Sequence, residues 1–190
     1  GKYKSIFDFF SRLNPSILNK RQIEYLSMAG VFDSFKVNRA TVFNSSTSLL
    51  QISQNIYLEE KSNQQMIFSD HNNDKNFLHL IKNAKPWNQA TYFLNEFYAL
   101  GFLISGNPLY EDIKYFKNFN LSNSEKIEEN SINGKIFEVL VFLIKYEEKN
   151  IGNTKFLDLF FIDIKGTFNL RVYRDKVDEM GIKIKEGNIY

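Results

Sequence analysis

The sequence NKRQIEYLSMAGVFD, residues 19–33, decides how the first part of the chain folds. Asn19 and Gln22 have the spacing of a capping box, which fixes the start of a helix. Gly30 ends that helix, because glycine tolerates a positive φ. Residues 29–33 are therefore predicted to form a tight hairpin between two helices.

Two further helices are predicted on either side of this hairpin. Ser5 can cap a short helix over residues 5–13. A third helix is predicted to begin near Asn38 and to extend to about Glu60. We therefore interpret residues 1–58 as one all-α region.

Four basic side chains cluster near the ends of these helices: Lys20, Arg21, Lys36 and Arg39. They suit contacts with DNA phosphates, and backbone N–H groups of the hairpin near Gly30 would add to those contacts. Basic residues near helix ends are also common on ordinary solvated surfaces, so both interpretations stay open.

Residues 59–86 are the most polar part of the chain and are predicted to form a flexible tether. Within it, the sequence QQMIF at residues 64–68 places three consecutive apolar residues among polar ones. Such a segment either tucks Ile67 and Phe68 against its own domain or displays them as a short peptide ligand for a partner's pocket.

A helical segment is predicted after the tether, over residues 87–117. Its main helix is strongly apolar and covers residues 88–104, and the sequence SGNP at residues 105–108 stops it. A shorter helical piece follows at residues 110–116. Residues 118–133 are polar and are predicted to be a linker.

The hydrophobic period changes at residue 134, where β-strand patterns replace helical ones. Strands are predicted at residues 136–145, 154–164 and 167–174, followed by a helix at 175–180 and the start of another strand. This order suits a truncated five-stranded Greek-key barrel of the OB type over residues 134–190. The fold class is therefore an α+β, multi-domain fragment, with the all-α part first and the partial barrel second.

The strand at residues 167–174 alternates between apolar and polar side chains, so its two faces differ. Arg171 and Tyr173 lie on the polar face and would meet single-stranded nucleic acid by charge and by stacking. An ordinary solvated strand face explains the same pattern, and the alternation does not separate the two.

The composition excludes several classes of site. The 190 residues contain no cysteine and two histidines, which excludes disulfides and thiolate sites and argues against a zinc site. No apolar run is long enough to span a membrane and no signal peptide is present, so a cytoplasmic protein with no membrane partner is predicted. The net charge of +2 predicts neither nucleic acid nor acidic partners by itself.

No catalytic machinery is predicted. The sequence has no P-loop, dinucleotide fingerprint, nucleophile elbow or zinc-protease motif. Asp158 and Asp163 are five residues apart on or next to one predicted strand, so they would face opposite sides and could not share metal ions. We predict no catalytic and no metal-binding residues.

The two ends of the sequence suggest a fragment of a longer protein. The chain starts at Gly1 and ends where a strand is predicted to begin.

Several motifs, in order, resemble those of the alpha subunits of bacterial DNA polymerase III, the C-family replicative polymerases. The matching segments are Phe7-Asp8-Phe9 with Arg12, Leu18-Asn19-Lys20-Arg21 with Glu24, Ala29-Gly30-Val31-Phe32-Asp33, Asn38-Arg39-Ala40, Leu94-Asn95-Glu96, Leu100-Gly101-Phe102, Ser105-Gly106-Asn107-Pro108-Leu109 and Phe161-Ile162-Asp163-Ile164-Lys165-Gly166. Asn107 replaces the family's usual His, and Val31 replaces a usual Ala.

The resemblance implies three binding functions. Helix-hairpin-helix units would hold double-stranded DNA, and the OB part would lie near single-stranded template. The family's ligand for the sliding clamp, the beta subunit, reads Gln, two variable residues, an aliphatic residue and Phe. It corresponds here to Gln64, Met66, Ile67 and Phe68, with Met66 and Ser69 departing from the usual residues.

The resemblance also implies the reaction of a parent protein, which is template-directed DNA synthesis with Mg²⁺. The palm carboxylates that hold those ions would lie upstream, so this fragment would need no cofactor of its own. Other subunits of the replicase holoenzyme are further expected partners. Two alternatives remain: a non-enzymatic DNA-repair or accessory protein built from helix-hairpin-helix and OB modules, and a structural domain without DNA contact.

Overall fold

A computed structural model describes residues 1–62, 81–129 and 134–190. The described chain divides into two compact units. The first comprises Gly1–Asn88 with Tyr98–Gly101, and the second comprises Gln89–Phe97 with Phe102–Tyr190. In the described ranges no helix combines the length and the apolar character that a membrane crossing requires.

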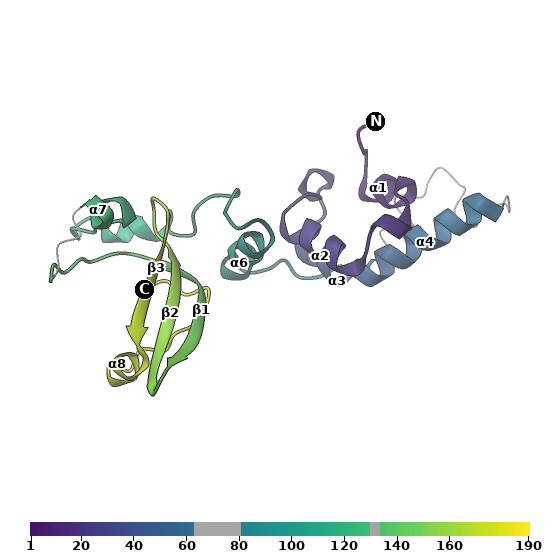
Figure 1. Ribbon diagram of the computed structural model, residues 1–190. Helices are drawn as coiled ribbons and strands as arrows, with labels where there is room; N and C mark the ends of the chain where they lie inside the picture. Colours follow the sequence, from purple (N-terminus) through teal and green to yellow (C-terminus); the bar gives the residue numbers. More distant parts are fainter. Residues whose placement is uncertain (63–80, 130–133) are drawn as a thin grey trace. The chain divides into compact units, whose positions relative to one another are not determined.

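The regular elements in the described residues of the first unit are all helices (Figure 1). They are α1 (Ile6–Arg12), η1 (Pro15–Ile17), α2 (Lys20–Met28), η2 (Asp33–Phe35), α3 (Arg39–Asn44) and α4 (Ser46–Ser62). Their core includes Phe10 and Phe32, both almost completely buried. The Phe9 ring meets the Phe32 ring edge-on at 5.2 Å between centroids. Burying a side chain of this size contributes roughly 1.5–3 kcal/mol, so these rings anchor α1 to the hairpin.

The predicted helix starts are confirmed by hydrogen bonds. The Ser5 hydroxyl accepts from the Asp8 amide at 3.1 Å and caps α1. At α2, the Asn19 side chain accepts from the Gln22 amide at 2.9 Å, and the Gln22 side chain accepts from the Asn19 amide at 2.8 Å. Both caps depend on residues three apart in sequence, which is why the sequence alone predicts them.

The predicted single helix from Asn38 to Glu60 is wrong, because the structure breaks it into α3 and α4 at Ser45. The Ser45 amide is shared between the carbonyl groups of Thr41 and Val42, at 3.1 and 3.2 Å, which tightens the end of α3. Asn and Ser side chains compete with the helix for backbone hydrogen bonds, and residues 44–48 are all Asn, Ser or Thr.

The predicted bounds of the tether, residues 59–86, differ from the structure at both ends. At its start, α4 continues to Ser62. At its end, Ile81 is buried in the helical core. The Ala84 carbonyl accepts from the Asn38 side chain at 2.9 Å, and its amide donates to the Thr41 hydroxyl at 2.9 Å. These contacts fix residues 81–84 on α3.

The second unit combines helices with a three-stranded antiparallel sheet in the order β1-β2-β3. Its elements are α6 (Gln89–Leu100), η3 (Asp112–Phe116), α7 (Ser124–Glu129), β1 (Phe142–Ile151), β2 (Thr154–Ile162), β3 (Thr167–Tyr173) and α8 (Arg174–Glu179). Figure 1 shows the strands side by side, with α8 at one end of them. One face of the sheet packs on α8 through Val177, and the other packs partly on α6 through Phe93.

Three predicted boundaries in this unit differ from the structure. The helix predicted to reach residue 104 ends at Leu100, because Gly101 has a φ of 80°. The predicted linker at residues 118–133 contains α7, whose start is capped by Asn123. The first strand begins at Phe142 and not at residue 136. Local signals, a glycine stop after α6 and an Asn cap before α7, account for the first two differences.

Near the end of the chain, where the start of a further strand was predicted, an isolated β-bridge joins Ile189 to Phe142. Val141 and Tyr190 exchange two backbone hydrogen bonds, each at 2.9 Å. The Leu143 amide donates to the Asn188 carbonyl at 2.9 Å, and the Gly187 amide donates to the Leu143 carbonyl at 2.8 Å. Residues 187–190 thus pair with the start of β1 on the side away from β2. This pairing and the helix after β3 are consistent with a partial OB-type barrel, and the α+β fold class is confirmed.

Candidate nucleic-acid interface

The hairpin after α2 closes by its own backbone hydrogen bonds. Gly30 has a φ of 78° and follows the last helical residues. Its amide donates to the Ser27 carbonyl at 3.0 Å, and the Val31 amide donates to the Leu26 carbonyl at 3.1 Å. These two bonds form a Schellman motif, which satisfies carbonyl groups at the end of a helix. The Gly30 amide, expected to face a phosphate, therefore has a partner inside the chain.

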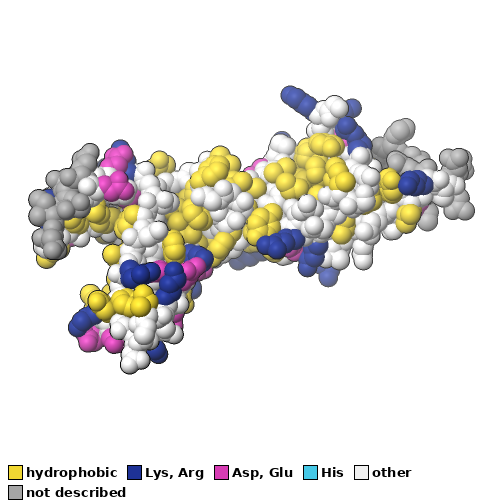
Figure 2. All heavy atoms as spheres, viewed as in Figure 1, with side chains coloured by type: hydrophobic (Ala, Val, Ile, Leu, Met, Phe, Trp, Pro, Cys, Tyr) yellow, Lys and Arg dark blue, Asp and Glu magenta, His cyan; other side chains and the backbone are white. Residues whose placement is uncertain are grey.

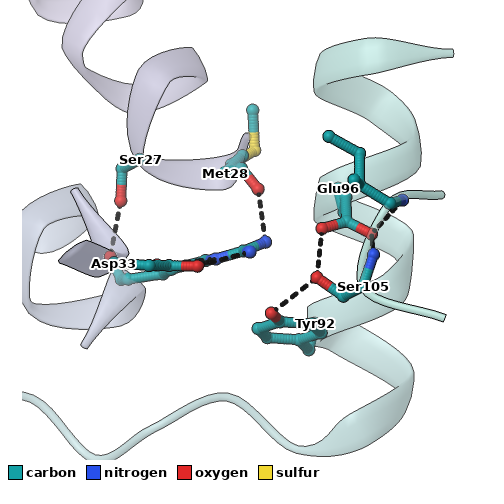
Figure 3. Close-up of polar contacts among 8 residues, drawn as sticks. Ser27, Met28, Asp33, Tyr92, Glu96 and Ser105 are labelled. Atoms are coloured by element: carbon teal, nitrogen blue, oxygen red, sulfur yellow. Dashed lines mark hydrogen bonds and ion pairs between the residues drawn. The ribbon is translucent and has the colours of Figure 1, made fainter. Parts of the chain in front are cut away.

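Arg39 holds this hairpin closed. Its guanidinium pairs with the Asp33 carboxylate at 2.7 Å and donates to the Met28 carbonyl at 3.0 Å. The Ser27 hydroxyl donates to the Arg39 carbonyl at 2.6 Å, and Figure 3 shows Ser27, Met28 and Asp33 with these contacts as dashed lines. Arg39 is buried, so the structure gives it a structural role where the sequence predicted a phosphate contact.

Lys20, Arg21 and Lys36 are exposed. Lys20 lies 3.5 Å from Glu24, and the Arg21 guanidinium lies 5.4 Å from the centre of the Tyr25 ring. A hydrogen bond with Tyr25 raises the pKa of Arg21. Lys20 and Arg21 begin α2 whereas Lys36 follows its far end. At 1.5 Å per residue, the nine residues of α2 span roughly 13 Å.

The second basic and aromatic surface lies on the sheet. Strand pairing aligns nine residues in three rows on one face: Lys145, Phe160 and Asn169; Glu147, Asp158 and Arg171; Lys149, Phe156 and Tyr173. We call this surface the sheet face. The opposite face of β2 carries Leu157, Leu159 and Phe161, which are buried in the core with Val177 of α8. Figure 2 shows basic, acidic and hydrophobic side chains gathered over the strands.

Asp158 is the centre of the sheet face and is mostly buried. Its two carboxylate oxygens accept from Arg171 at 2.6 and 2.8 Å, and Lys149 lies 2.8 Å away. Hydrogen bonds from Arg171, and then from Lys149, hold the pKa of Asp158 well below its usual range. Glu147 pairs with both Lys145 and Lys149. The charges of this face are therefore largely balanced by one another.

Aromatic rings flank this ion-pair network. The Phe156 and Tyr173 rings lie 5.0 Å apart, and the Arg171 guanidinium is 5.9 Å from the centre of the Phe156 ring. On the other side, the Lys145 ammonium is 5.7 Å from the centre of the Phe160 ring. Rings beside basic groups are what a stacking surface for single-stranded nucleic acid requires.

Sequence reasoning placed Arg171 and Tyr173 together on one side of their strand, and the structure does the same. It missed Phe156, Phe160 and the two lysines of the sheet face. A usable signal was present, because Phe156, Asp158 and Phe160 alternate with buried residues along β2. The sequence did not show which residues of β1 lie beside these three, because the start of β1 was predicted at residue 136 and lies at Phe142.

Several motif residues in the second unit hold turns together. Glu96 of α6 is fully buried and accepts from the amides of Ile104 and Ser105 at 3.0 Å each. The Ser105 hydroxyl donates to Glu96 at 2.6 Å and lies 2.8 Å from the Tyr92 hydroxyl (Figure 3). The stop after α6 is thus tied back to the helix by a buried carboxylate.

Asp163 organises the turn between β2 and β3. Its carboxylate accepts from the amides of Lys165 and Gly166 at 2.7 Å each, and from the amide and hydroxyl of Ser124. The Asn107 side chain donates to the Asp163 carbonyl at 2.6 Å and accepts from the Leu109 amide at 2.8 Å. The turn, the loop after α6 and the start of α7 therefore meet at one residue.

The predicted clamp-binding residues Gln64, Met66, Ile67 and Phe68 lie outside the described residues. As for metals, the described ranges hold no group of three or more His, Cys, Asp or Glu side chains that could bind an ion.

Residues 1–42 match the helix-hairpin-helix motif family. Curated relatives match far more of the chain. The DNA polymerase III subunit alpha of Rickettsia bellii is 30% identical over 178 residues, which cover 93% of this chain and 15% of that protein. The protein of the same name from Caulobacter vibrioides is 36% identical over 110 residues, covering 57% of this chain and 9% of that protein. The one from Campylobacter jejuni is 26% identical over 199 residues, covering 100% of this chain and 16% of that protein.

Proposed function

The chain belongs to the family of bacterial DNA polymerase III alpha subunits, and from this premise we propose that it binds DNA and the sliding clamp for a replicative DNA polymerase. The observation that carries the proposal is similarity along 93% of the chain, which begins with the helix-hairpin-helix match. The chain spans about 15% of the length of the Rickettsia bellii relative. We place the whole protein in the cytoplasm, with other holoenzyme subunits.

The proposed reaction is template-directed DNA synthesis, carried out by parts of such a protein other than these residues. Mg²⁺ supports that reaction by bridging phosphate oxygens and neutralising charge. The described residues do not fit a magnesium site, since Asp158 is held by basic side chains and Asp163 by backbone amides. No catalytic step is assigned to this chain.

The helical unit is proposed to bind duplex DNA through phosphates. Lys20, Arg21 and Lys36 are the candidate contacts, because each is exposed on an element next to the hairpin. Arg39 and Gly30 contribute indirectly: they fix the hairpin between α2 and α3. Phosphate contacts position a protein on DNA without reading its sequence, so binding should not depend on base sequence.

The salt dependence of duplex binding tests this proposal. Changing Lys20, Arg21 and Lys36 together to Ala should weaken binding and flatten the plot of log K against log salt, by about 0.9 for each lost phosphate contact. The measurement is fluorescence anisotropy with a labelled duplex. The control changes Lys114, Lys117 and Lys176 to Ala, which removes the same charge from exposed positions of the second unit. Equal slopes in both triple variants would contradict the proposed contacts.

The peptide at residues 64–68 is proposed to bind the sliding clamp. Ile67 and Phe68 would fill an apolar pocket, while the Gln64 amide makes directional hydrogen bonds. Such a peptide binds weakly alone but gains from the high effective concentration of a polymerase already on DNA. The polar residues on both sides would keep it extended and accessible.

Substitutions within the peptide test clamp binding. Gln64→Ala, or Ile67→Ala with Phe68→Ala, should abolish binding to the purified clamp in surface plasmon resonance. Gln65→Ala is the matched control and should keep binding, because only Gln64 stands four residues before Phe68. Unchanged clamp affinity in the Gln64 and the double variant, with a normal far-UV spectrum, would remove this assignment.

The sheet face is proposed to meet single-stranded DNA. Tyr173, Phe156 and Phe160 offer rings for bases, and Arg171 lies between them. Base stacking is tolerant of sequence because every base has a π-face, which suits a template strand of any sequence.

A further inference from the structure

Asp158 stands where a nucleic-acid surface would be expected to carry a basic or neutral residue. We propose that Asp158 is a specificity determinant: it keeps Arg171 and Lys149 in ion pairs, so that the sheet face binds single strands by stacking and rejects duplexes. The inference rests on the proposed single-strand function of this face and assigns it a selectivity.

The geometry gives both cations a partner within the protein. Arg171 presents two nitrogens to the two oxygens of Asp158, at 2.6 and 2.8 Å. Paired in this way, the guanidinium reaches across to the neighbouring strand, because Asp158 of β2 lies opposite Arg171 of β3. Lys149 is bound twice, at 2.8 Å by Asp158 and at 3.5 Å by Glu147. A phosphate would have to displace a bidentate carboxylate, which is one of the stronger protein contacts.

The remaining charges on the face do not restore a basic surface. Three basic side chains, Lys145, Lys149 and Arg171, share the face with two acidic ones, Glu147 and Asp158. Lys145 is itself paired with Glu147. Most protein affinity for duplex DNA comes from phosphate neutralisation, so a nearly balanced face has little to offer a duplex.

The aromatic rings do not depend on this balance. Phe156, Phe160 and Tyr173 are partly buried or exposed residues of the same face. Bases of a single strand are free to stack on such rings, whereas bases of a duplex are already stacked on one another. Charge balance on the face with retained rings therefore favours the single strand.

Asp158→Asn tests the inference, since it removes the charge and keeps the shape. The full chain carries Ala at Lys20, Arg21 and Lys36, so that the remaining binding does not come from those residues. Anisotropy is measured with labelled oligo-dT and with a labelled duplex across salt concentrations. Asp158→Asn should tighten oligo-dT binding, steepen its salt slope by up to about 1.4 for two released cations, and bring in duplex binding.

Two further variants test whether the effect is specific to Asp158 and to the cations that it holds. Asp178→Asn is the matched control: it makes the same charge change in α8, where Asp178 pairs with Arg174 at 3.0 Å, and should leave both affinities unchanged. Combined with Asp158→Asn, Arg171→Gln should cancel much of the gain, because it removes one of the two released cations. If Asp158→Asn fails to fold, Arg171→Gln alone still tests the inference: a salt slope for oligo-dT that falls by about 0.7 would show that Arg171 already contacts a phosphate, and would overturn it.

The outcomes also separate this inference from the proposed function. If the native chain binds oligo-dT and Asp158→Asn does not bind it more tightly, the single-strand function is retained and the proposed selectivity is overturned. Equal gains in Asp158→Asn and Asp178→Asn would mean that net charge alone is responsible, which also overturns it. Binding by neither the native chain nor Asp158→Asn overturns both.

Discussion

Gly30 shows how much one residue can decide at the smallest scale. A Cβ built there would lie 2.2 Å from Nη2 of Arg39 and 2.7 Å from the Asp33 carboxylate, while φ is 78°. The glycine therefore meets two requirements: a left-handed backbone, and the close approach of an ion pair in which Arg39 is buried and Asp33 is exposed. The sequence predicted the first need from helix-stop rules and could not show the second, because the partner arrives from nine residues further along.

Gly30→Ala should destabilise the protein by about 1–3 kcal/mol, because it adds backbone strain and forces Arg39 off Asp33. Urea unfolding followed by circular dichroism measures the loss.

Gly101→Ala is the control for strain alone. Gly101 has nearly the same φ, 80°, and a Cβ there would meet nothing within 4 Å. It should cost about 1 kcal/mol. If the two variants lose equal stability, the steric conflict with Arg39 plays no part.

At the scale of elements, the helix caps were predicted correctly and the start of strand pairing was not. Caps at Ser5 and Asn19 confirmed two helix starts, since both ends of each contact lie within three residues. The break at Ser45 also has a local signal, the run of Asn, Ser and Thr at residues 44–48, and it was missed. The position of β1 depends on pairing with the neighbouring strand. The run at residues 136–145 is apolar throughout, so its pattern could not say where strand pairing begins.

Asn107 connects elements and offers a test at this scale. Asn107→Ala should cost about 1–3 kcal/mol, because it removes two hydrogen bonds and leaves the Asp163 carbonyl and the Leu109 amide to find new partners.

Asn107→His is the matched comparison and should stay within about 1 kcal/mol of the native chain. A neutral imidazole has one donor and one acceptor, as the Asn107 amide uses here. Thermal and urea unfolding of both variants provide the measurement. A His variant as unstable as the Ala variant would show that the two hydrogen bonds need the amide geometry.

At the scale of the whole molecule, the sequence predicted the α+β class and the family, and the comparisons bear out both. The candidate sites were predicted less completely. Lys20, Arg21 and Lys36 are exposed as expected, whereas Arg39 and the Gly30 amide are engaged inside the hairpin. Residue type alone cannot distinguish a basic side chain that is available to phosphate from one that is paired with a carboxylate. The difference depends on which elements pack together.

The hydrogen bonds that join Ser124 and Asn107 to Asp163 have an evolutionary consequence. Ser124 bonds the Asp163 carboxylate, so positions 124 and 163 should change together among descendants of this chain. Asn107 meets Asp163 through its carbonyl, which every residue type possesses, and also accepts from the Leu109 amide. Position 107 is therefore free to change among side chains that both donate and accept a hydrogen bond, whatever stands at position 163.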